Sequence, residues 1–272
     1  MTFSIARVAA LAVALCGAIQ VSAAPVEAPR LISRAGASVV TKCSVPNTVA
    51  LTFDDGPYTW TNELVDLLDE NGAKGVIVGC IYDDANAKRV KYVYDKGHQV
   101  ASHTWRHERL STLSGDELLS EFSKTDDAIK KITGAVPAFV RPPFGDYDDD
   151  VLEVAASRGQ TVANWDFDSG DAAGVSSRSQ YNKLIMSGPD SILTLNHETK
   201  PKCVHRLVVE YGTNAISSSE DVIPYAIQQI KAKGYKLVTV AECLGESPYQ
   251  STGTPSSRDV SENDTLAPNP QC

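Results

Sequence analysis

Two aspartates stand side by side at the end of an apolar, β-branched run early in the chain. The run is Thr48–Phe53, the carboxylates are Asp54 and Asp55, and Gly56-Pro57 follows at once. Such a run predicts a buried strand, and Gly-Pro predicts its end. A turn would explain one aspartate here, since Asp favours turns after strands. Because charged side chains are rarely buried without a partner, the pair suggests a metal ion.

Polar side chains able to bind metal or move protons follow four further apolar runs, at 98–102, 138–140, 161–165 and 191–196. These side chains are His103, His107, Arg141, Asp166, Asp168, Asp171 and His197. In a parallel α/β barrel the carboxyl ends of all strands share one face, and that face carries the chemistry. We therefore expect these side chains to meet at one site.

His103 and His107 are four residues apart, so on one helical turn their rings would point the same way. With one carboxylate they form a set that holds zinc and leaves positions open for water and substrate. Zinc lowers the pKa of its water towards about 7. Iron oxygenases use similar ligands, but the second aspartate and Arg141 would have no role in such an enzyme.

The remaining side chains supply the other parts of a hydrolytic site. One aspartate can ligate while its neighbour accepts the proton of the water. Arg141 can hold that neighbour ionised through a forked ion pair. His197 is a candidate acid because histidine titrates near neutral pH, and Asp171 could raise its pKa. The set predicts hydrolysis of an amide or ester.

Helical patterns separate the strand-like runs. We expect helices around Leu64–Leu68, Lys88–Lys96, Ser114–Gly134, Asp150–Arg158, Ser179–Met186 and Ser217–Gly234, and a last strand at Tyr235–Val240. Ser114–Glu117 and Ser217–Glu220 have the form of capping boxes. Strands that alternate with helices predict an α/β fold with a parallel sheet.

The chain of 272 residues carries a formal net charge of -9, which argues against nucleic acid or an acidic polymer as partner.

Residues 1–24 have the form of a secretory signal peptide, with Arg7 before an apolar run and small residues at 22–24. Residues 25–42 are a linker or pro-segment. From 247 to 272 the composition predicts a disordered tail with a glycosylation sequon at Asn263. We expect no membrane span in the mature protein.

Six cysteines are present, of which Cys16 lies in the signal segment. None of the others forms a C-x-x-C pair, so disulfides are the default in an oxidising compartment. Their pairing is left open by the residues alone: Cys43, Cys80, Cys203, Cys243 and Cys272.

Five segments resemble, in order, the five motifs of NodB-type polysaccharide deacetylases (carbohydrate esterase family 4), and most of all the secreted fungal chitin deacetylases. The segments are Thr52–Pro57, Ser102–His107, Arg141–Gly145, Asp168–Asp171 and Leu195–His197. The resemblance covers residues 43–246 and implies a distorted (β/α) barrel.

The same resemblance implies a role for each motif residue. Zinc, or cobalt or another divalent metal, would be held by Asp55, His103 and His107. Asp54 would be the base and His197 the acid, with Arg141 orienting Asp54 and Asp171 tuning His197. Contacts with the substrate would come from the backbone N–H of Phe144, from Leu195 against the acetyl methyl, and from Trp165. A disulfide would join Cys43 to Cys243.

The resemblance implies a secreted or cell-wall, monomeric hydrolase that removes N-acetyl groups from the N-acetylglucosamine residues of chitin or its oligomers. Esterase action on acetylated xylan and deacetylation of peptidoglycan are the alternatives within the enzyme class. A third alternative is a catalytically impaired chitin-binding protein. It is suggested by the short apolar run 76–78 and by an insertion at 201–218 with Cys203 and His205. Ala172, where the family has an aromatic residue, is a separate departure that concerns the substrate groove and His197.

Overall fold

The computed structural model describes residues 36–79, 81, 83–173, 175–199 and 222–256. Several sequence predictions fall outside the described residues: the signal segment, most of the linker, the insertion with His205, the capping box at Ser217–Glu220, the sequon, and Cys80, Cys203 and Cys272. No helix within the described ranges is both long and apolar enough to cross a membrane.

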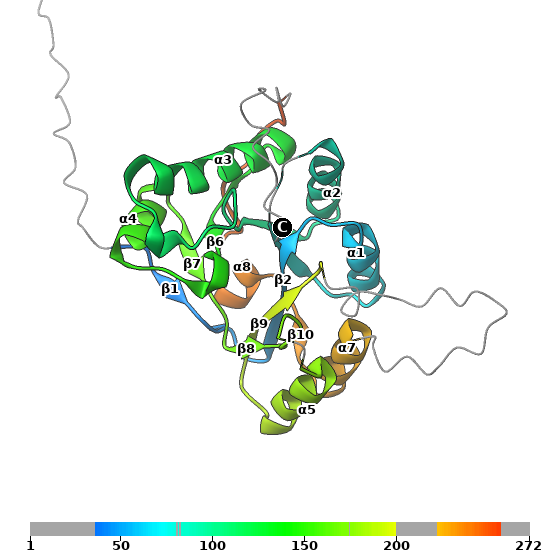
Figure 1. The fold of residues 1–272 in the computed structure, drawn as a ribbon. Helices are drawn as coiled ribbons and strands as arrows, with labels where there is room; N and C mark the ends of the chain where they lie inside the picture. The colour runs from blue at the N-terminus through cyan, green and yellow to red at the C-terminus, as the bar shows by residue number, and fades with distance from the viewer. Residues whose placement is uncertain (1–35, 80, 82, 174, 200–221, 257–272) are drawn as a thin grey trace, which may run out of the picture. The chain divides into compact units, whose positions relative to one another are not determined.

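Parallel strands form the centre of the fold (Figure 1). They pair in the order β1-β7-β6-β4-β3-β2-β9-β8, and β10 lies beside β2. Their bounds are β1 Val39–Val40, β2 Thr48–Gly56, β3 Gly75–Gly79, β4 Gln99–Ser102, β6 Phe139–Val140, β7 Thr161–Ala163, β8 Phe167–Asp168, β9 Ile192–His197 and β10 Lys236–Leu237. The short run at 76–78 lies in β3, which pairs with both β2 and β4.

The sheet is rolled, because two strands far apart in the pairing order are joined by a very short connection. β7 and β8 are six positions apart, which would be about 29 Å in a flat sheet. Only residues 164–166 connect them, and that connection spans at most about 15 Å. Asp166 bonds to β9 at this point: its N–H donates to Leu193 O (3.1 Å) and its Oδ1 accepts from Leu193 N–H (2.8 Å). The predicted α/β fold is confirmed, and the curvature agrees with a distorted barrel.

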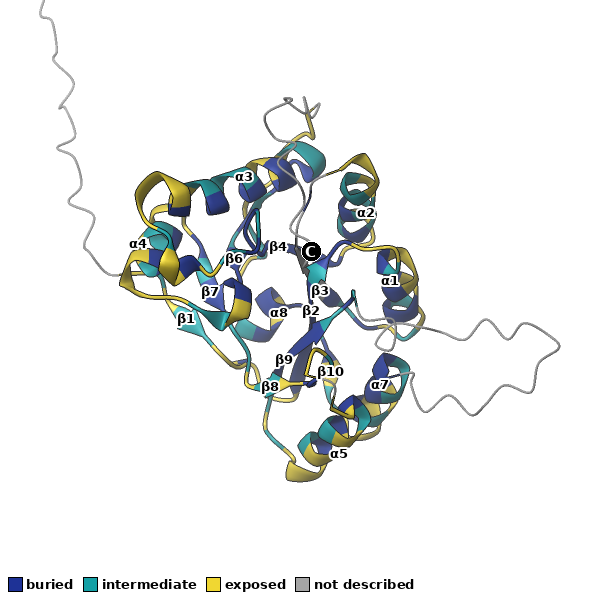
Figure 2. Ribbon diagram, viewed as in Figure 1, coloured by how far each residue is buried: buried dark blue, intermediate teal, exposed yellow. Residues whose placement is uncertain are grey.

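Helices cover the outside of the strands with their buried faces turned inward (Figure 2). Their bounds are α1 Thr61–Glu70, α2 Asp84–Asp95, α3 Gly115–Thr133, α4 Asp149–Ser157, α5 Ser177–Ser187, α7 Val222–Ala232 and α8 Val240–Leu244, with 3-10 turns at Leu110–Thr112 and Pro143–Gly145.

The period-two pleat of β2 sorts its side chains between two environments. Val49, Leu51 and Phe53 pack in the apolar cluster beneath the helices. Ala50 belongs to a second cluster, formed with α8 and the inner residues of neighbouring strands. Asp54 follows the same alternation as Ala50 and is 2 % exposed. The pleat therefore directs its carboxylate into the interior of the rolled sheet.

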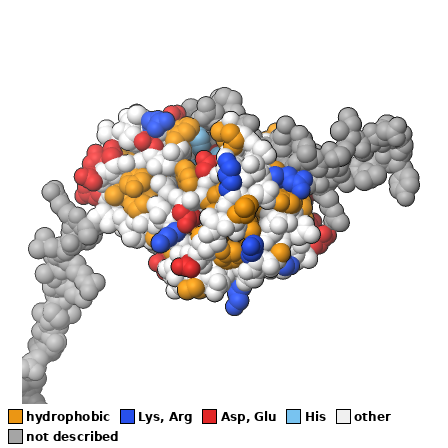
Figure 3. Space-filling model, turned by 90° about the horizontal axis from the view of Figure 1, so that it is seen from below, with side chains coloured by type: hydrophobic (Ala, Val, Ile, Leu, Met, Phe, Trp, Pro, Cys, Tyr) orange, Lys and Arg blue, Asp and Glu red, His pale blue; other side chains and the backbone are white. Residues whose placement is uncertain are grey.

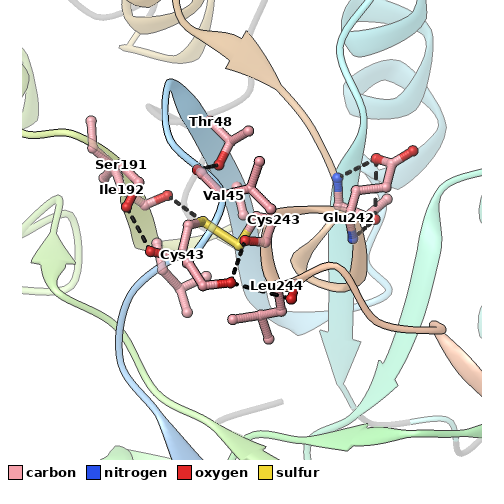
Figure 4. Close-up of a disulfide and its surroundings, with 12 residues drawn as sticks. Cys43, Val45, Thr48, Ser191, Ile192, Glu242, Cys243 and Leu244 are labelled. Atoms are coloured by element: carbon pink, nitrogen blue, oxygen red, sulfur yellow. Dashed lines mark hydrogen bonds between the residues drawn. A yellow bond between two sulfur atoms is a disulfide. The ribbon is translucent and has the colours of Figure 1, made fainter.

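A disulfide joins Cys43 to Cys243, as the resemblance implied, and links segments 200 residues apart (Figure 4). The backbone N–H groups of Ser44 and Val45 also donate to Cys243 O, at 3.0 and 2.9 Å. On the chain-entropy account a loop of this length contributes about 5 kcal/mol to stability. The bond fastens the segment before β2 to α8.

Two local predictions were wrong. The strand expected at Tyr235–Val240 is limited to Lys236–Leu237, because Thr239 and Glu242 form a capping box that starts α8 instead. The capping box expected at Ser114–Glu117 makes no side-chain capping bond. Gly115 has a φ of 54°, so the first turn of α3 lacks the regular geometry that such a box requires.

The tail was predicted to be disordered from residue 247, and its first part is not. β11 (Tyr249–Ser251) pairs antiparallel with β5 (Val136–Pro137). Tyr249 Oη accepts from Val100 N–H at 3.0 Å, and Gln250 Nε2 donates to Pro137 O at 2.7 Å. Backbone pairing and one tyrosine hold a segment that has few apolar residues. Residues 257–272 lie outside the described part of the chain.

Tyr249→Phe tests this packing. The change removes the acceptor of a buried strand N–H, so we expect the free energy of unfolding to fall by about 1–3 kcal/mol. Denaturant titration followed by circular dichroism measures it, with Tyr147→Phe at an exposed position as the control. Equal stability of the two variants would show that the Tyr249 contact contributes nothing.

Candidate functional site

Asp55, His103 and His107 converge at the carboxyl ends of β2 and β4. One ligand atom from each lies within 4.8 Å of the others. The Nε2 atoms of His107 and His103 are 3.1 and 3.5 Å from Asp55 Oδ1. The three residues therefore form a group that could hold a metal ion, and they are the three ligands that the resemblance implied.

The two histidines do not lie on a helix, which corrects the prediction of a helical turn. Residues 103–109 are a loop, and two of them have left-handed backbone conformations: Thr104 (φ 70°) and His107 (φ 55°). Left-handed conformations are rare for residues other than glycine and unusual for a β-branched one. The loop, and not helical periodicity, brings the two rings together.

Left-handed non-glycine residues gather at this site. Among the described residues five have such a φ, and four are Asp55 (64°), Thr104, His107 and Phe144 (60°). Conformations of this kind cost about 1–3 kcal/mol each and persist where the surroundings impose them. The rim of the sheet therefore holds its functional residues in backbone conformations that the chain would not adopt alone.

The orientation of His103 is set by a backbone carbonyl. Its Nδ1–H donates to Arg141 O at 2.7 Å, so Nε2, which is 3.5 Å from Asp55 Oδ1, is the ring nitrogen available to a metal. This is the arrangement in which a histidine ligand is held by a hydrogen bond from its other ring nitrogen.

The three side chains fit a divalent metal. Within the described part of the chain, Asp55 Oδ1 is buried and has no hydrogen-bond partner. Burial raises the pKa of Asp55, but the adjacent His103 and His107 outweigh it and hold the pKa well below its usual range. An anionic oxygen and two imidazole nitrogens are the ligands of catalytic zinc sites.

Behind Asp55, the turn at Gly56 depends on a buried carboxyl group. A Cβ at Gly56 would lie 1.4 Å from Glu198 Oε1, so any larger residue there would displace the Glu198 side chain. Glu198 is fully buried and accepts from Thr61 Oγ1 at 3.1 Å. Burial raises the pKa of Glu198 to about 8, so it is protonated at neutral pH. Sequence reasoning missed this residue.

Asp54 forms a buried ion pair with Arg141. The Nη1–Oδ1 distance is 2.7 Å, and Arg141 is 3 % exposed. The ion pair is not the forked one expected, because the other two guanidinium nitrogens donate to backbone carbonyl groups. Nε donates to Ala163 O (2.8 Å) and Nη2 donates to Asn164 O (3.1 Å). Asp54 is thus separated in role from Asp55, although the two are neighbours in sequence.

His197 lies in the same pocket and is paired with Asp171, as predicted. Its Nδ1 and its backbone N–H are each 2.7 Å from a carboxylate oxygen of Asp171. Burial lowers the pKa of His197, but Asp171, with the charges of Asp54 and Asp55, outweighs this and raises it.

The pocket has a volume of about 710 Å³. It contains the predicted Phe144, Trp165 and Leu195 beside the residues above, and its lining adds residues that sequence reasoning missed or did not assign: Tyr58, Asp168, Ala173 and Thr199. Ala172 also lines it, so this wall carries small side chains.

Tyr58 had a sequence signal, since it directly follows Gly56-Pro57. Asp166 does not line the pocket, because its carboxylate bonds to β9.

The charge around the molecule is mixed on the face shown in Figure 3, where histidine atoms lie among hydrophobic and acidic side chains. That face has no continuous basic surface.

Residues 41–163 match the family model described as Polysaccharide deacetylase. A chitin deacetylase of Pestalotiopsis sp is 36% identical over 231 residues, which are 79% of this chain and 71% of that protein. A probable peptidoglycan-N-acetylglucosamine deacetylase of Arthroderma benhamiae is 36% identical over 220 residues, covering 76% of this chain but 46% of that protein. The chain thus spans about half the length of some curated relatives.

The fold is similar to the solved structure of the chitin deacetylase of Colletotrichum lindemuthianum. The TM-score is 0.70 at 26% identity, over 80% of this chain and 96% of that one.

The pairing of His197 with Asp171 can be tested by titration. Asp171→Asn removes the adjacent negative charge, so we expect the pKa of His197 to fall. NMR of the labelled imidazole against pH measures the shift. Asp168→Asn, which also changes a pocket carboxylate, is the control and should leave the pKa nearly unchanged. A His197 pKa that does not fall in Asp171→Asn contradicts the assignment.

Proposed function

The chain belongs to the polysaccharide deacetylase family, and from this premise we propose that it is a secreted, metal-dependent hydrolase of chitin or chitin oligomers. It removes the N-acetyl groups of N-acetylglucosamine residues. The observation that carries the proposal is the placement of Asp54 and His197 in one pocket with the metal-binding group of Asp55, His103 and His107. The names of the fungal relatives support the substrate.

The metal is proposed to be zinc, with cobalt or another divalent ion as alternatives. Held by Asp55, His103 and His107, it would polarise the reacting groups and lower the pKa of water to about 7. The two-imidazole, one-carboxylate set supports zinc, because it leaves positions open for water and substrate.

Asp54 is proposed as the general base. It accepts a proton as the water oxygen attacks the acetyl carbonyl carbon. Arg141 fixes the direction of the Asp54 carboxylate through the 2.7 Å ion pair. The carboxylate is buried beside His103, with Oδ2 3.8 Å from Nε2, so it faces the metal-binding group.

His197 is proposed as the general acid. It donates a proton to the amide nitrogen as the C–N bond breaks, and the products are acetate and a free amine on the sugar. The raised pKa of His197 favours the protonated imidazole that a general acid requires. Asp171 maintains that state through Nδ1. The second proton of the water stays on the carboxyl product, which then ionises to acetate in water, and transfer of the Asp54 proton to His197 restores both residues.

The pocket walls are proposed to orient the sugar. The N–H of Phe144 would stabilise the oxyanion, and Leu195 would contact the acetyl methyl group. The rings of Tyr58, Phe144 and Trp165 offer apolar faces for the sugar. A neutral polymer suits the formal net charge of -9. Secretion is supported by the Cys43–Cys243 disulfide, a bond typical of oxidising compartments.

Three alternatives are separated by measurement. Peptidoglycan deacetylation draws support from the names of two relatives, and acetylxylan esterase action would use the same parts. Acetate release from each polymer distinguishes them. An impaired chitin-binding protein is less favoured, because β3 pairs with both β2 and β4, and because Asp54 and His197 each have a charged partner, Arg141 and Asp171. Retained chitin binding without acetate release would support it.

Removal of the metal should abolish activity. We expect no acetate release from N-acetylglucosamine oligomers after chelation and dialysis, and recovery on addition of Zn²⁺, because the water is activated only with metal present. Undiminished release by protein shown to be metal-free would reject the proposal.

Asp54 and Asp55 should fail in different ways when changed to asparagine. Asp55→Asn removes an anionic ligand, so the metal content should fall markedly. Asp54→Asn should keep the metal but lose proton transfer, a fall of about 10²–10⁴-fold in rate. Elemental analysis and acetate release are measured on both. Equal metal loss, or an active Asp54→Asn enzyme, would overturn the two roles.

A further inference from the structure

The loop between the two histidine ligands lacks the hydrogen bonds that a helix would provide. Its central N–H groups, those of Trp105 and Arg106, instead donate to one side chain of α3. Glu121 Oε2 accepts from Trp105 N–H at 3.0 Å and from Arg106 N–H at 2.7 Å. Glu121 Oε1 accepts from Arg106 Nε at 3.2 Å. The carboxylate therefore fastens the midpoint of the segment from His103 to His107.

Glu121 is itself held rigidly. It is 2 % exposed and lies between Leu118 and Phe122, which pack in the apolar cluster of α3, α4, β6 and β7. A buried carboxylate is costly unless hydrogen bonds satisfy it, and here three N–H groups do so. Charge-assisted bonds of this kind are stronger than bonds between neutral groups. The core of the protein thus fixes the position of the carboxylate, and the carboxylate fixes the loop.

Of the contacts that Glu121 makes, the two to backbone N–H groups matter more for the shape of the loop than the one to the Arg106 side chain. The side chain of Arg106 is 40% exposed and can be solvated, so it does not require a buried partner. The N–H groups of residues 105 and 106 follow the left-handed Thr104 and precede the left-handed His107. Without the carboxylate of Glu121, these two N–H groups would lose the acceptor that they share, and the loop would relax towards ordinary conformations.

We propose that Glu121 is a positioning residue that sets the geometry of the His103 and His107 ligands before the metal binds. The inference rests on the proposed metal site. Glu121 touches neither substrate nor metal, and it acts by accepting two backbone hydrogen bonds, so the length of its side chain matters more than its charge.

Two conservative variants separate length from charge. Glu121→Gln keeps an amide oxygen that can accept from both backbone N–H groups, whereas Glu121→Asp keeps the charge but is one methylene too short. We expect Glu121→Asp to weaken Zn²⁺ binding by about 10–100-fold, the usual effect of losing a group that supports a ligand. Glu121→Gln should bind within about threefold of wild type. Competition with a chromophoric chelator measures the affinity without any substrate.

Glu117→Asp and Glu117→Gln, one turn earlier on the same helix and exposed, are matched controls and should bind Zn²⁺ normally. Wild-type affinity in Glu121→Asp, or weaker binding by Glu121→Gln than by Glu121→Asp, overturns the proposal.

A measurement on the metal-free wild-type protein needs no variant to fold. Because the loop is held before metal binds, the amides of Trp105 and Arg106 should exchange slowly with deuterium in the absence of metal. Fast exchange there also overturns the proposal. Failure of the wild-type protein to bind Zn²⁺ would instead contradict the metal site itself.

Discussion

The buried ion pair between Arg141 and Asp54 connects the parts of this site to one another. The Arg141 side chain spans the interior of the rolled sheet, from β6 to β2 and to the end of β7. Its carbonyl orients His103, and its guanidinium orients Asp54. Because each buried charge would be very costly alone, the pair keeps both residues in place. One residue therefore aligns a proposed metal ligand with the proposed base.

The chemistry is placed where the strands end and the backbone leaves regular structure. Asp55, Thr104, His107 and Phe144 occupy left-handed conformations that the surrounding structure must impose. Two buried carboxyl groups lie behind these residues and contact neighbouring parts of the chain. Glu121 holds the histidine loop through three hydrogen bonds, and Glu198 fills the space beside Gly56. The proposed catalytic residues line the pocket, whereas the supporting residues Glu121 and Glu198 do not.

The sequence predicts the pocket residues better than it predicts the supporting residues behind them. Asp55, His103 and His107 were predictable because they follow apolar runs within recognisable motifs, and the alternation of strands and helices predicted the α/β fold. Glu121 and Glu198 were not, because their partners lie 15 or more residues away and no local pattern marks them. The helical turn at His103–His107 was wrong since spacing cannot reveal a left-handed Thr104. The order in the early tail depends on Tyr249 meeting β4, a contact known only from the fold.

The claim that Asp55, His103 and His107 hold the metal is tested most directly by anomalous diffraction from crystals of the zinc-loaded protein, at the zinc absorption edge. The account predicts one strong peak about 2.0–2.2 Å from a carboxylate oxygen of Asp55 and from Nε2 of both histidines. A peak bound elsewhere, or no ordered peak in a protein that contains zinc, would contradict it.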